Sequence, residues 1–372
     1  MIAMRVCFVS PEFFHWGVYG GFGYLTWMLS RKLAERGIDA SVVTQLRPGQ
    51  GAVEEVDGVT VYGYPSHSSG LGSLFARRES MKYYRMAEAD IYHSQAISYN
   101  SYIAQVACPE KKHALTFQDP YDRAEWRRIA QVEPKYGTLS HRLRVEAEIR
   151  FLSNTCNRMD ALYSQAHFLV KKAVDLYGLS FKPSFLPNPV PIPDEPVDKS
   201  ETPTVCFLAR WDPQKRVELF FQLAQSYPEI DFIAMGKSHD PEKDRALREA
   251  YSKVPNLTLN GFVSEAEKQE ILGRSWALVN TSIREALPVS FLEALACNTP
   301  VISGENPDEL VSQYGYHVQG DDYEAGIRWL LESDNWRGKG KMGRRHVERV
   351  YDADKVADLH IREYEKIIEA SH

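Results

Sequence analysis

The sequence lacks paired cysteines, long apolar runs and an excess of basic charge. Its five cysteines are scattered and form no C-x-x-C pair, which argues against a disulfide framework or a zinc site and fits buried thiols in a reducing cytosol. No apolar run approaches the roughly 20 residues that a transmembrane helix needs. The formal net charge of -6 provides no basic field for nucleic acid or an anionic membrane. These absences predict a cytoplasmic chain that binds no nucleic acid.

What the sequence does contain is a repeated alternation of β-rich runs and helical stretches over 372 residues, enough for two domains. Such alternation predicts parallel sheets covered by helices. RVCFVS (5–10) is predicted as the first strand rather than a signal peptide, and the pattern restarts at TVCFLAR (204–210). Between them, LPNPVPIPDEP (186–196) is expected to form a stiff, extended hinge. The sequence therefore predicts two Rossmann-like halves.

The individual elements are predicted from hydrophobic periodicity and from breaker residues. A helix is predicted at 24–37, a long helical stretch at 123–158, and an amphipathic helix at the C-terminal end. The remaining strands are predicted at 40–45, 59–64, 90–95, 113–118, 161–165, 231–236, 257–262, 277–282 and 300–304.

Two glutamates eight residues apart, Glu285 and Glu293, mark the most informative stretch, NTSIREALPVSFLEALACNTPVISG (280–304). A strand ends at the loop that holds Glu285, and Pro288 opens the short helix that carries Glu293. Doubly wound sheets bind ligands at this carboxyl edge. A helix start attracts phosphate, so the two acids are expected to face hydroxyls, such as the ribose diol and the sugar ring of a nucleotide-sugar. Taken alone, the spacing is more often simple helix-charge stabilisation.

A cationic pair lies in FLARWDPQKRVELFF (207–221). Arg210 ends a strand, and Lys215 follows five residues later, just before a helix. Without a metal, a departing nucleoside diphosphate has to be neutralised by side chains and dipoles. Arginine can clamp phosphate with two hydrogen bonds, and lysine acts as a compact point charge. The alternative interpretation is a solvated basic loop. The acidic pair Glu285 and Glu293 in the same half of the chain argues against this alternative.

A glycine loop, Gly20-Gly21-Phe22-Gly23, precedes the first helix. It does not fit G-x-G-x-x-G, because Thr26 stands where the third glycine belongs. No suitable glycine loop follows TVCFLAR (204–210) either, so a dehydrogenase is disfavoured.

The stretch E-x7-E followed by ALACNTPVIS resembles the signature of retaining GT-B glycosyltransferases of the family 4-like group, also described as glycosyl transferases group 1. Its variant E-G-L-P-x-S-x-L-E-A is close to EALPVSFLEA, with Ala286 in place of the usual glycine. The R-x4-K spacing of Arg210 and Lys215 matches the group's diphosphate-binding element. LPNPV resembles its hinge-proximal I-P-N-G-V, so the resemblance covers nearly the whole chain.

The resemblance implies a role for each candidate residue. Glu285 would contact the donor sugar, Glu293 the ribose, and Arg210 with Lys215 the diphosphate. The glycine loop would lie against the donor phosphates or the acceptor, although a plain strand–helix turn stays open. The full set of implied donor-binding positions is Glu293, Gly20, Gly21, Phe22, Gly236, Phe262, Leu287, Pro288 and Val289. Neither a metal nor another cofactor is expected.

Several positions depart from the group's pattern. Gln118 stands where many relatives have a histidine near the donor sugar, and glutamine cannot become cationic. His93 matches the first histidine of the group's H-x-H, with a packed strand-end histidine as the alternative. Both residues are candidate sugar or acceptor contacts, and so is Glu12, whose spacing decides nothing. Asp352-Ala353-Asp354 superficially matches a metal-binding D-x-D but is interpreted as helix capping.

Acceptor recognition is expected in the N-terminal half. The segment 119–151 carries arginines that could meet an anionic acceptor, although interleaved acids favour a salt-bridged solvent face. These are Arg123, Arg127, Arg128, Arg142 and Arg144. The segment 69–84 is a second candidate, as a mobile acceptor loop or a weak membrane contact. The expected partners are a nucleoside-diphosphate sugar and a sugar, glycan or lipid-linked acceptor, with peripheral membrane contact left open.

The predicted fold is α/β with GT-B architecture: two facing Rossmann-like domains with parallel sheets and a C-terminal crossover helix. The predicted domains are 1–188 for the acceptor, 189–350 for the donor, and 351–372 as a helix packing back on the first. The implied activity is metal-independent hexosyl transfer with retention, in which the leaving phosphate helps to deprotonate the acceptor. A sugar-nucleotide epimerase, a pyridoxal phosphate-dependent phosphorylase and a catalytically drifted partner subunit remain alternatives.

Overall fold

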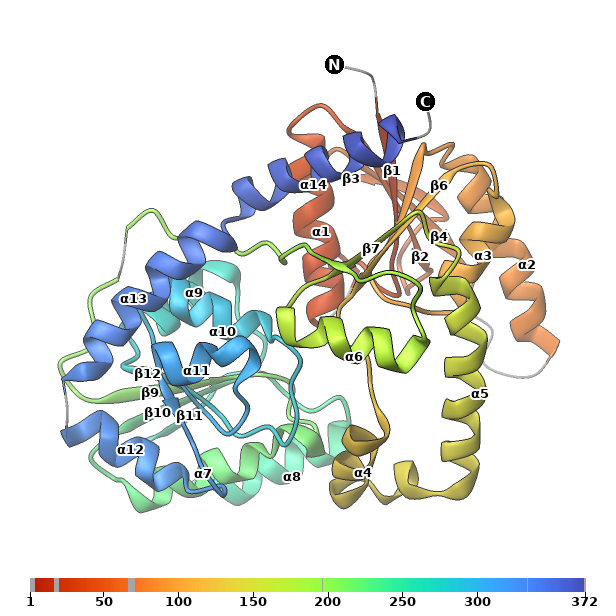
Figure 1. The fold of residues 1–372 in the computed structure, drawn as a ribbon. Helices are drawn as coiled ribbons and strands as arrows, with labels where there is room; N and C mark the ends of the chain where they lie inside the picture. The colour runs from red at the N-terminus through yellow and green to blue at the C-terminus, as the bar shows by residue number, and fades with distance from the viewer. Residues whose placement is uncertain (1–3, 17–19, 66–70, 196, 333, 371–372) are drawn as a thin grey trace. The chain divides into compact units, whose positions relative to one another are not determined.

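The computed structural model describes residues 4–16, 20–65, 71–195, 197–332 and 334–370, with the backbone alone for 71–78. The chain divides into two compact units, whose elements are labelled in Figure 1. Unit 1 comprises Met1–Asp122, Arg142–Pro189 and Ala353–His372, and unit 2 comprises Arg123–His141 and Val190–Asp352. Unit 1 thus differs from the predicted N-terminal domain over 1–188 at residues 123–141, which belong to unit 2.

Unit 1 is built on an eight-stranded sheet in the order β3-β4-β2-β1-β5-β6-β7-β8. All neighbouring strands are parallel except the β3–β4 pair, which is antiparallel. Its strands are β1 (Arg5–Val9), β2 (Asp39–Gln45), β3 (Val53–Val56), β4 (Val59–Tyr64), β5 (Ile91–Ser94), β6 (Lys112–Phe117), β7 (Ala161–Ser164) and β8 (Ser184–Phe185). Strands β3 and β8 of this sheet were not predicted from the sequence. For β3 a local signal was present, because Asp57-Gly58, both at positive φ, form the two-residue turn typical of a hairpin.

The helices of unit 1 include two that are distant in sequence and adjacent in space. In Figure 1, α14 (blue) lies beside α1 (red), and Arg36, two residues after the end of α1, donates hydrogen bonds to Asp354 and Asp358 on α14. Asp354 is thus an ion-pair partner rather than a helix cap. The helices are α1 (Gly21–Ala34), α2 (Leu71–Met86), α3 (Tyr99–Ala107), α5 (Leu139–Cys156, which begins in unit 2), α6 (His167–Tyr177) and α14 (Ala353–Glu369).

Two predicted segments differ in detail from the observed elements. The single helical stretch at 123–158 is divided into α4 (Arg123–Val132), the short 3-10 helix η1 (Pro134–Gly137) and α5. Pro134 explains the division, because proline has no N–H for the helical hydrogen bond. The candidate acceptor loop at 69–84 is mostly helix α2; its residues 69 and 70 and the side chains of 71–78 lie outside the described residues.

Unit 2 contains a six-stranded parallel sheet in the order β11-β10-β9-β12-β13-β14, as expected for a Rossmann-like half. Its strands are β9 (Thr204–Leu208), β10 (Asp231–Met235), β11 (Leu257–Leu259), β12 (Ala277–Asn280), β13 (Val301–Ser303) and β14 (Tyr316–His317). Its helices besides α4 and η1 are η2 (Pro213–Lys215), α7 (Val217–Ser226), α8 (Pro241–Tyr251), α9 (Glu265–Arg274), α10 (Val289–Ala296), η3 (Pro307–Glu309), α11 (Leu310–Tyr314), α12 (Tyr323–Glu332) and α13 (Asn335–Val350).

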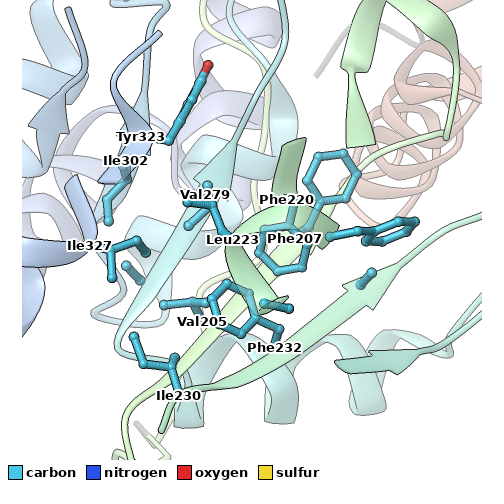
Figure 2. Packing of buried hydrophobic residues seen from close by; sticks show 14 of the residues in the cluster. Val205, Phe207, Phe220, Leu223, Ile230, Phe232, Val279, Ile302, Tyr323 and Ile327 are labelled. Carbon is cyan, nitrogen blue, oxygen red and sulfur yellow. The ribbon is translucent and has the colours of Figure 1, made fainter. Parts of the chain in front are cut away.

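An apolar core fills unit 2 between the sheet and its helices. Figure 2 shows Phe207 from β9, Phe220 from α7 and Phe232 from β10 gathered together, all fully buried. The ring centroids of Phe220 and Phe232 are 5.2 Å apart in an edge-to-face arrangement, which is favourable for aromatic pairs. This core supports the strand ends that carry the candidate site. The α/β class with two parallel-sheet domains is confirmed.

The structure confirms the predicted burial of the cysteines. All five cysteines are buried and unpaired. Burial raises the pKa of the Cys206 thiol to about 12, so this group stays protonated at neutral pH and is a weak nucleophile. No helix among the described residues combines the length and the apolar composition that crossing a bilayer requires.

Two histidines are buried where α14 packs on the unit 1 sheet. His93 on β5 lies with Nδ1 2.7 Å from the hydroxyl of Tyr364 and Nε2 2.8 Å from Thr116 Oγ1. Burial lowers the pKa of His93 well below its ordinary value, and the neighbouring His360 lowers it further. Burial also lowers the pKa of His360 to about 4, although Glu363 acts in the opposite direction. Both rings are therefore neutral in the folded chain at neutral pH.

Unit 1 is expected to lose stability on mild acidification. Below pH 6.5 these histidines bind protons in the unfolded chain, whereas folded His93 and His360 stay neutral. The stability that is fully present above pH 6.5 is therefore lost as the pH falls toward 4. Each histidine is expected to contribute about 1.4 kcal/mol per pH unit in this window. Melting temperatures between pH 7 and 4.5 measure the slope. His360→Leu should reduce it and substitution of the exposed His239 should not; equal slopes in all three proteins would contradict the prediction.

Candidate active site

Glu285 lies in the loop between β12 and α10, with its side chain 8% exposed. Its Oε1 accepts hydrogen bonds from Lys215 Nζ and Ser282 Oγ, both at 2.6 Å, and from Asn280 Nδ2 at 3.1 Å. Burial alone would raise the pKa of Glu285, but the Lys215 ammonium and these hydrogen bonds bring it below its ordinary value. The carboxylate is therefore charged and held at one oxygen. No donor among the described residues bonds to Oε2, which leaves that oxygen for a ligand hydroxyl.

Lys215 is positioned by hydrogen bonds between its own loop and the loop after β12. The hydroxyl of Thr281 donates to the carbonyl oxygen of Lys215 at 2.7 Å, and the amide of Ile283 donates to that of Gln214 at 3.0 Å. The strand order places β9 directly beside β12, so the segments that follow them meet at one edge of the sheet. The structure thus joins two residues, Lys215 and Glu285, to which the sequence analysis assigned separate tasks.

Arg216, which the sequence analysis did not select, reinforces the same connection. Its backbone is left-handed, with φ +47°. Its Nε donates to the carbonyl oxygen of Thr281 at 2.8 Å, and its two terminal nitrogens bind both carboxylate oxygens of Asp321 at 2.8 Å each. A bidentate arginine–carboxylate pair fixes geometry more strictly than a single contact. An arginine next to Lys215 was visible in the sequence, but its partner lies 105 residues away.

Arg210 takes a different position. It follows β9, its side chain is 41% exposed, and its Nη2 lies 3.2 Å from Asp212 Oδ2. Within the described residues, no hydrogen bond or ion pair joins Arg210 to Lys215 or Glu285. An exposed guanidinium with one weakly bound acid remains able to bind an anion such as a phosphate.

Glu293 belongs to α10 and forms an ion pair with α9. Its Oε1 lies 2.5 Å from Lys268 Nζ, and both side chains are mostly buried. Burial lowers the pKa of Lys268, but Glu293 and then Glu265 outweigh it, so the net direction is upward and the amine stays charged. Lys268 is a site residue that the sequence analysis missed, because a lysine within SEAEKQEIL looks like part of a solvated helix face.

The start of α10 offers backbone N–H groups between the two acids. Pro288 is the residue before the helix, in an extended conformation rather than in the first turn, and no side chain caps the helix. Val289 opens the helix, and Leu287 is buried, so these positions would meet a ligand mainly through the backbone. Uncapped N–H groups at a helix start suit an anion. At the other end Asn298 has φ +57°, which confirms the predicted left-handed cap.

Gly236 and Phe262 lie at the ends of β10 and β11. Gly236 has φ +123°, and a Cβ atom there would lie 2.0 Å from the carbonyl oxygen of Ala209. Glycine is therefore required by the close approach of neighbouring strand ends, whatever else it contacts. The amide of Gly236 donates to the carbonyl oxygen of Gly261 at 2.9 Å, and Phe262 beside it is 57% exposed.

The glycine loop of unit 1 meets a carboxylate. Glu12 Oε1 accepts a hydrogen bond from the amide of Gly23 at 3.3 Å, in the first turn of α1. Thr26, in place of the third glycine, is buried and binds Ser10 at 2.9 Å and the carbonyl oxygen of Phe22 at 2.8 Å. A carboxylate at this helix start repels phosphate. Contact of Gly20, Gly21 and Phe22 with the donor phosphates or with the acceptor stays a prediction.

The structure places two candidate sugar contacts, His93 and Gln118, in the interior of unit 1. Both ring nitrogens of His93 bind side chains in the core, and the residue is fully buried. Gln118 and Asn188 form a reciprocal amide pair with distances of 2.9 and 2.8 Å, and Asn188 also donates to Gln165 at 2.5 Å. All three amides are buried. Gln118 therefore connects the end of β6 to the residues before the hinge, because its amide oxygen and nitrogen are both used there.

No three His, Cys, Asp or Glu side chains within the described ranges gather in a way that could hold a metal ion.

The arginines proposed for acceptor binding differ in their surroundings. Arg128 binds Glu305 and the carbonyl oxygen of Ile283, as a salt-bridged face would predict. Arg127 is exposed and donates only to Arg123 of its own helix in the hydrogen bonds that the structure describes.

Comparison with known proteins gives matches over most of the chain. Residues 192–344 match the family Glycosyl transferases group 1, and residues 19–192 match Glycosyltransferase Family 4. Glycosyltransferase 1 domain-containing protein 1 of Xenopus tropicalis is 26% identical over 104 residues, which are 28% of this chain and 30% of that protein. The matched region thus spans less than a third of that relative.

Among solved structures, sucrose-phosphate synthase from Thermosynechococcus elongatus has a TM-score of 0.77 at 16% identity, covering 99% of this chain and 100% of that one. HepE of Anabaena, solved in complex with UDP and glucose, has a TM-score of 0.72 at 14% identity, covering 97% and 99%. At such identities the likeness concerns the fold, and the two family matches concern the sequence. Together they establish that the chain belongs to the GT-B glycosyltransferases of the family 4-like group.

Proposed function

We propose that this chain transfers a sugar from a nucleoside-diphosphate sugar to an acceptor hydroxyl, with retention of configuration and without a metal. The observation that carries the proposal is the pair of Lys215 and Glu285, 2.6 Å apart at the carboxyl edge of the unit 2 sheet. A cation that suits a leaving diphosphate and a carboxylate that suits sugar hydroxyls meet at one position. The uncapped start of α10 adds backbone donors for phosphate beside them.

Each residue then has a distinct task. Lys215 and the exposed Arg210 stabilise the negative charge that develops on the departing diphosphate. Glu285, fixed through Oε1, accepts a hydrogen bond from a donor-sugar hydroxyl through Oε2. Glu293 accepts from the ribose. The leaving phosphate helps to deprotonate the acceptor, which attacks from the same face, so no side chain needs to act as a nucleophile.

The acceptor belongs to unit 1 in this proposal. Glu12 at the start of α1 suits a hydroxyl group of a sugar, a glycan or a lipid-linked sugar. The donor is a hexosyl nucleotide, of which the UDP and the glucose in the HepE complex represent the two parts. We place the enzyme in the cytoplasm, with peripheral membrane contact for a lipid-linked acceptor.

A thermal-shift screen of UDP, ADP and GDP with their sugar derivatives tests the proposal, because a ligand that binds only the folded state raises the melting temperature. At least one nucleotide and its sugar form should stabilise the chain. Product analysis then separates the alternatives: a transferase forms a new glycoside, and an epimerase changes the nucleotide-sugar without an acceptor. Binding without turnover over a broad acceptor panel would indicate a drifted partner subunit. An absorbance scan would reveal a bound pyridoxal phosphate if the chain were instead a phosphorylase.

Activity is expected to survive treatment with EDTA. In this proposal Lys215, Arg210 and the α10 start perform the charge neutralisation that a divalent ion performs in metal-dependent transferases. Turnover is measured before and after chelation, and again after Mg²⁺ or Mn²⁺ is added back. An absolute metal requirement would contradict the assignment of the cationic pair.

A further inference from the structure

Helix α4 belongs to unit 2, although its sequence lies in the N-terminal half of the chain. The chain leaves unit 1 at Asp122, forms α4 and η1, and returns to unit 1 at Arg142 within α5. The ring of Trp126 on α4 packs against Tyr136 and His141 at centroid distances of 5.3 and 4.7 Å. The segment from Arg123 to His141 therefore has aromatic contacts of its own.

Helix α4 contacts the loop between β12 and α10, residues 281–288, which is called the acidic loop below. The first contact is a buried ion pair. Glu125 Oε1 accepts a hydrogen bond from Arg284 Nε at 2.9 Å, and the two side chains are 10% and 3% exposed. Arg284 immediately precedes Glu285 in sequence. Removal of one partner from a buried pair is strongly unfavourable, so Glu125 restrains the loop at this residue.

The second contact lies one turn further along α4. Arg128 Nη2 donates to the carbonyl oxygen of Ile283 and to Glu305 Oε1. The other oxygen of Glu305 accepts from the amide of Glu285 at 3.4 Å, and the amide of Glu305 donates to Ser303 Oγ at 3.0 Å. Three consecutive residues, 283 to 285, are thus connected directly or through Glu305 to α4.

We infer that α4 clamps the acidic loop and that Glu125 and Arg128 are positioning residues for Glu285. Lys215, Ser282 and Asn280 fix one carboxylate oxygen, and the clamp fixes the backbone from which the side chain extends. Together, the contacts to the carboxylate and to the backbone orient Oε2 of Glu285 toward the donor sugar. The inference rests on the proposed function for the identity of that sugar, but the clamp itself is a property of the folded chain.

Arg128→Ala is the main test, because Arg128 is 46% exposed and its loss should leave the fold intact. Displacement of a reacting group by 1 Å can cost about 100-fold, and loss of one of two contacts is expected to lower kcat about tenfold. Affinity for the nucleoside diphosphate alone should stay unchanged, because Arg210, Lys215 and Glu293 are untouched. Arg328→Ala is the matched control: Arg328 is 48% exposed and pairs with Asp322 and Glu324 elsewhere in unit 2.

A charge exchange tests the buried pair. Glu125→Arg and Arg284→Glu are each expected to reduce kcat, and the double variant should recover much of the loss because it restores opposite charges. The probes are UDP-glucose, ADP-glucose and GDP-mannose, whichever the wild-type chain turns over. The clamp is overturned if Arg128→Ala keeps the wild-type kcat, or if the double variant, folded by its melting curve, is as inactive as the single ones.

Amide hydrogen exchange of the peptide 281–288 provides a measurement that needs no ligand. Arg128→Ala should raise exchange there, and Arg328→Ala should not. Unchanged exchange in Arg128→Ala contradicts the clamp even when kcat falls. If no nucleotide or nucleotide-sugar of the thermal-shift screen stabilises the wild-type chain, the proposed function fails, and the exchange measurement then decides on the clamp by itself.

Discussion

Lys215→Ala is expected to lower kcat by about 100- to 1000-fold, the range found when one electrostatic stabiliser of a transition state is removed. The variant loses a cation beside the departing diphosphate, and it also removes the 2.6 Å contact that holds Glu285 Oε1. Steady-state turnover of the donor measures the effect. Lys253→Ala, an exposed lysine of the same unit, is the control and should keep wild-type turnover.

The pH profile of Lys215→Ala adds a second readout. In the wild type the Lys215 ammonium lowers the pKa of Glu285 against the opposing effect of burial. Without it the pKa of Glu285 rises, so the carboxylate becomes protonated at a higher pH as the solution is acidified. The acid limb of kcat/KM should therefore move to higher pH. An unmoved acid limb together with a small change in kcat would contradict the role of the pair.

Glu293→Ala is expected to weaken binding of the nucleoside diphosphate by about 10- to 100-fold, since a hydrogen bond to a charged group contributes about 1.5–3 kcal/mol. It should also destabilise the chain by about 3–5 kcal/mol, because it breaks the mostly buried pair with Lys268. Calorimetric titration measures the affinity well below the melting temperature, and thermal unfolding measures the stability.

Lys268→Met separates the two effects of Glu293→Ala. It breaks the same ion pair, so a comparable loss of stability is expected, but it leaves the Glu293 carboxylate in place for the ribose. Nucleotide affinity should therefore fall much less than in Glu293→Ala. Equal losses of affinity in the two variants would assign Glu293 to structure alone and remove its ribose role.

Several features of the structure were accessible from local sequence signals. Short β-rich runs predicted the strands other than β3, β8 and β14, and Asn298 before Pro300 predicted the end of α10, because these signals depend on neighbouring residues. The missed hairpin at Asp57-Gly58 also had a local signal. The break at Pro134 was predictable for the same reason, although the helical periodicity on both sides obscured it.

For the candidate site, the residues themselves could be predicted from local sequence, but their partners could not. A parallel sheet places all its carboxyl ends at one edge, so Arg210, Lys215, Glu285 and Glu293 could be assigned to one face of one domain. Their partners could not be assigned. Lys268, Asp321 and Glu125 lie 25, 105 and 159 residues from the groups they bind, and each looks like an ordinary surface charge in its own segment.

The sequence by itself thus determined that the chain forms two Rossmann-like halves and that the candidate acidic and basic residues belong to the second of them. Periodicity, breaker residues and motif spacing are properties of short segments, and they are sufficient for that level. Only the tertiary structure decided that His93 and Gln118 are internal, that Glu12 occupies the start of α1, and that α4 belongs to unit 2. These outcomes depend on contacts between distant segments, where burial and a charged partner decide what each side chain can bind.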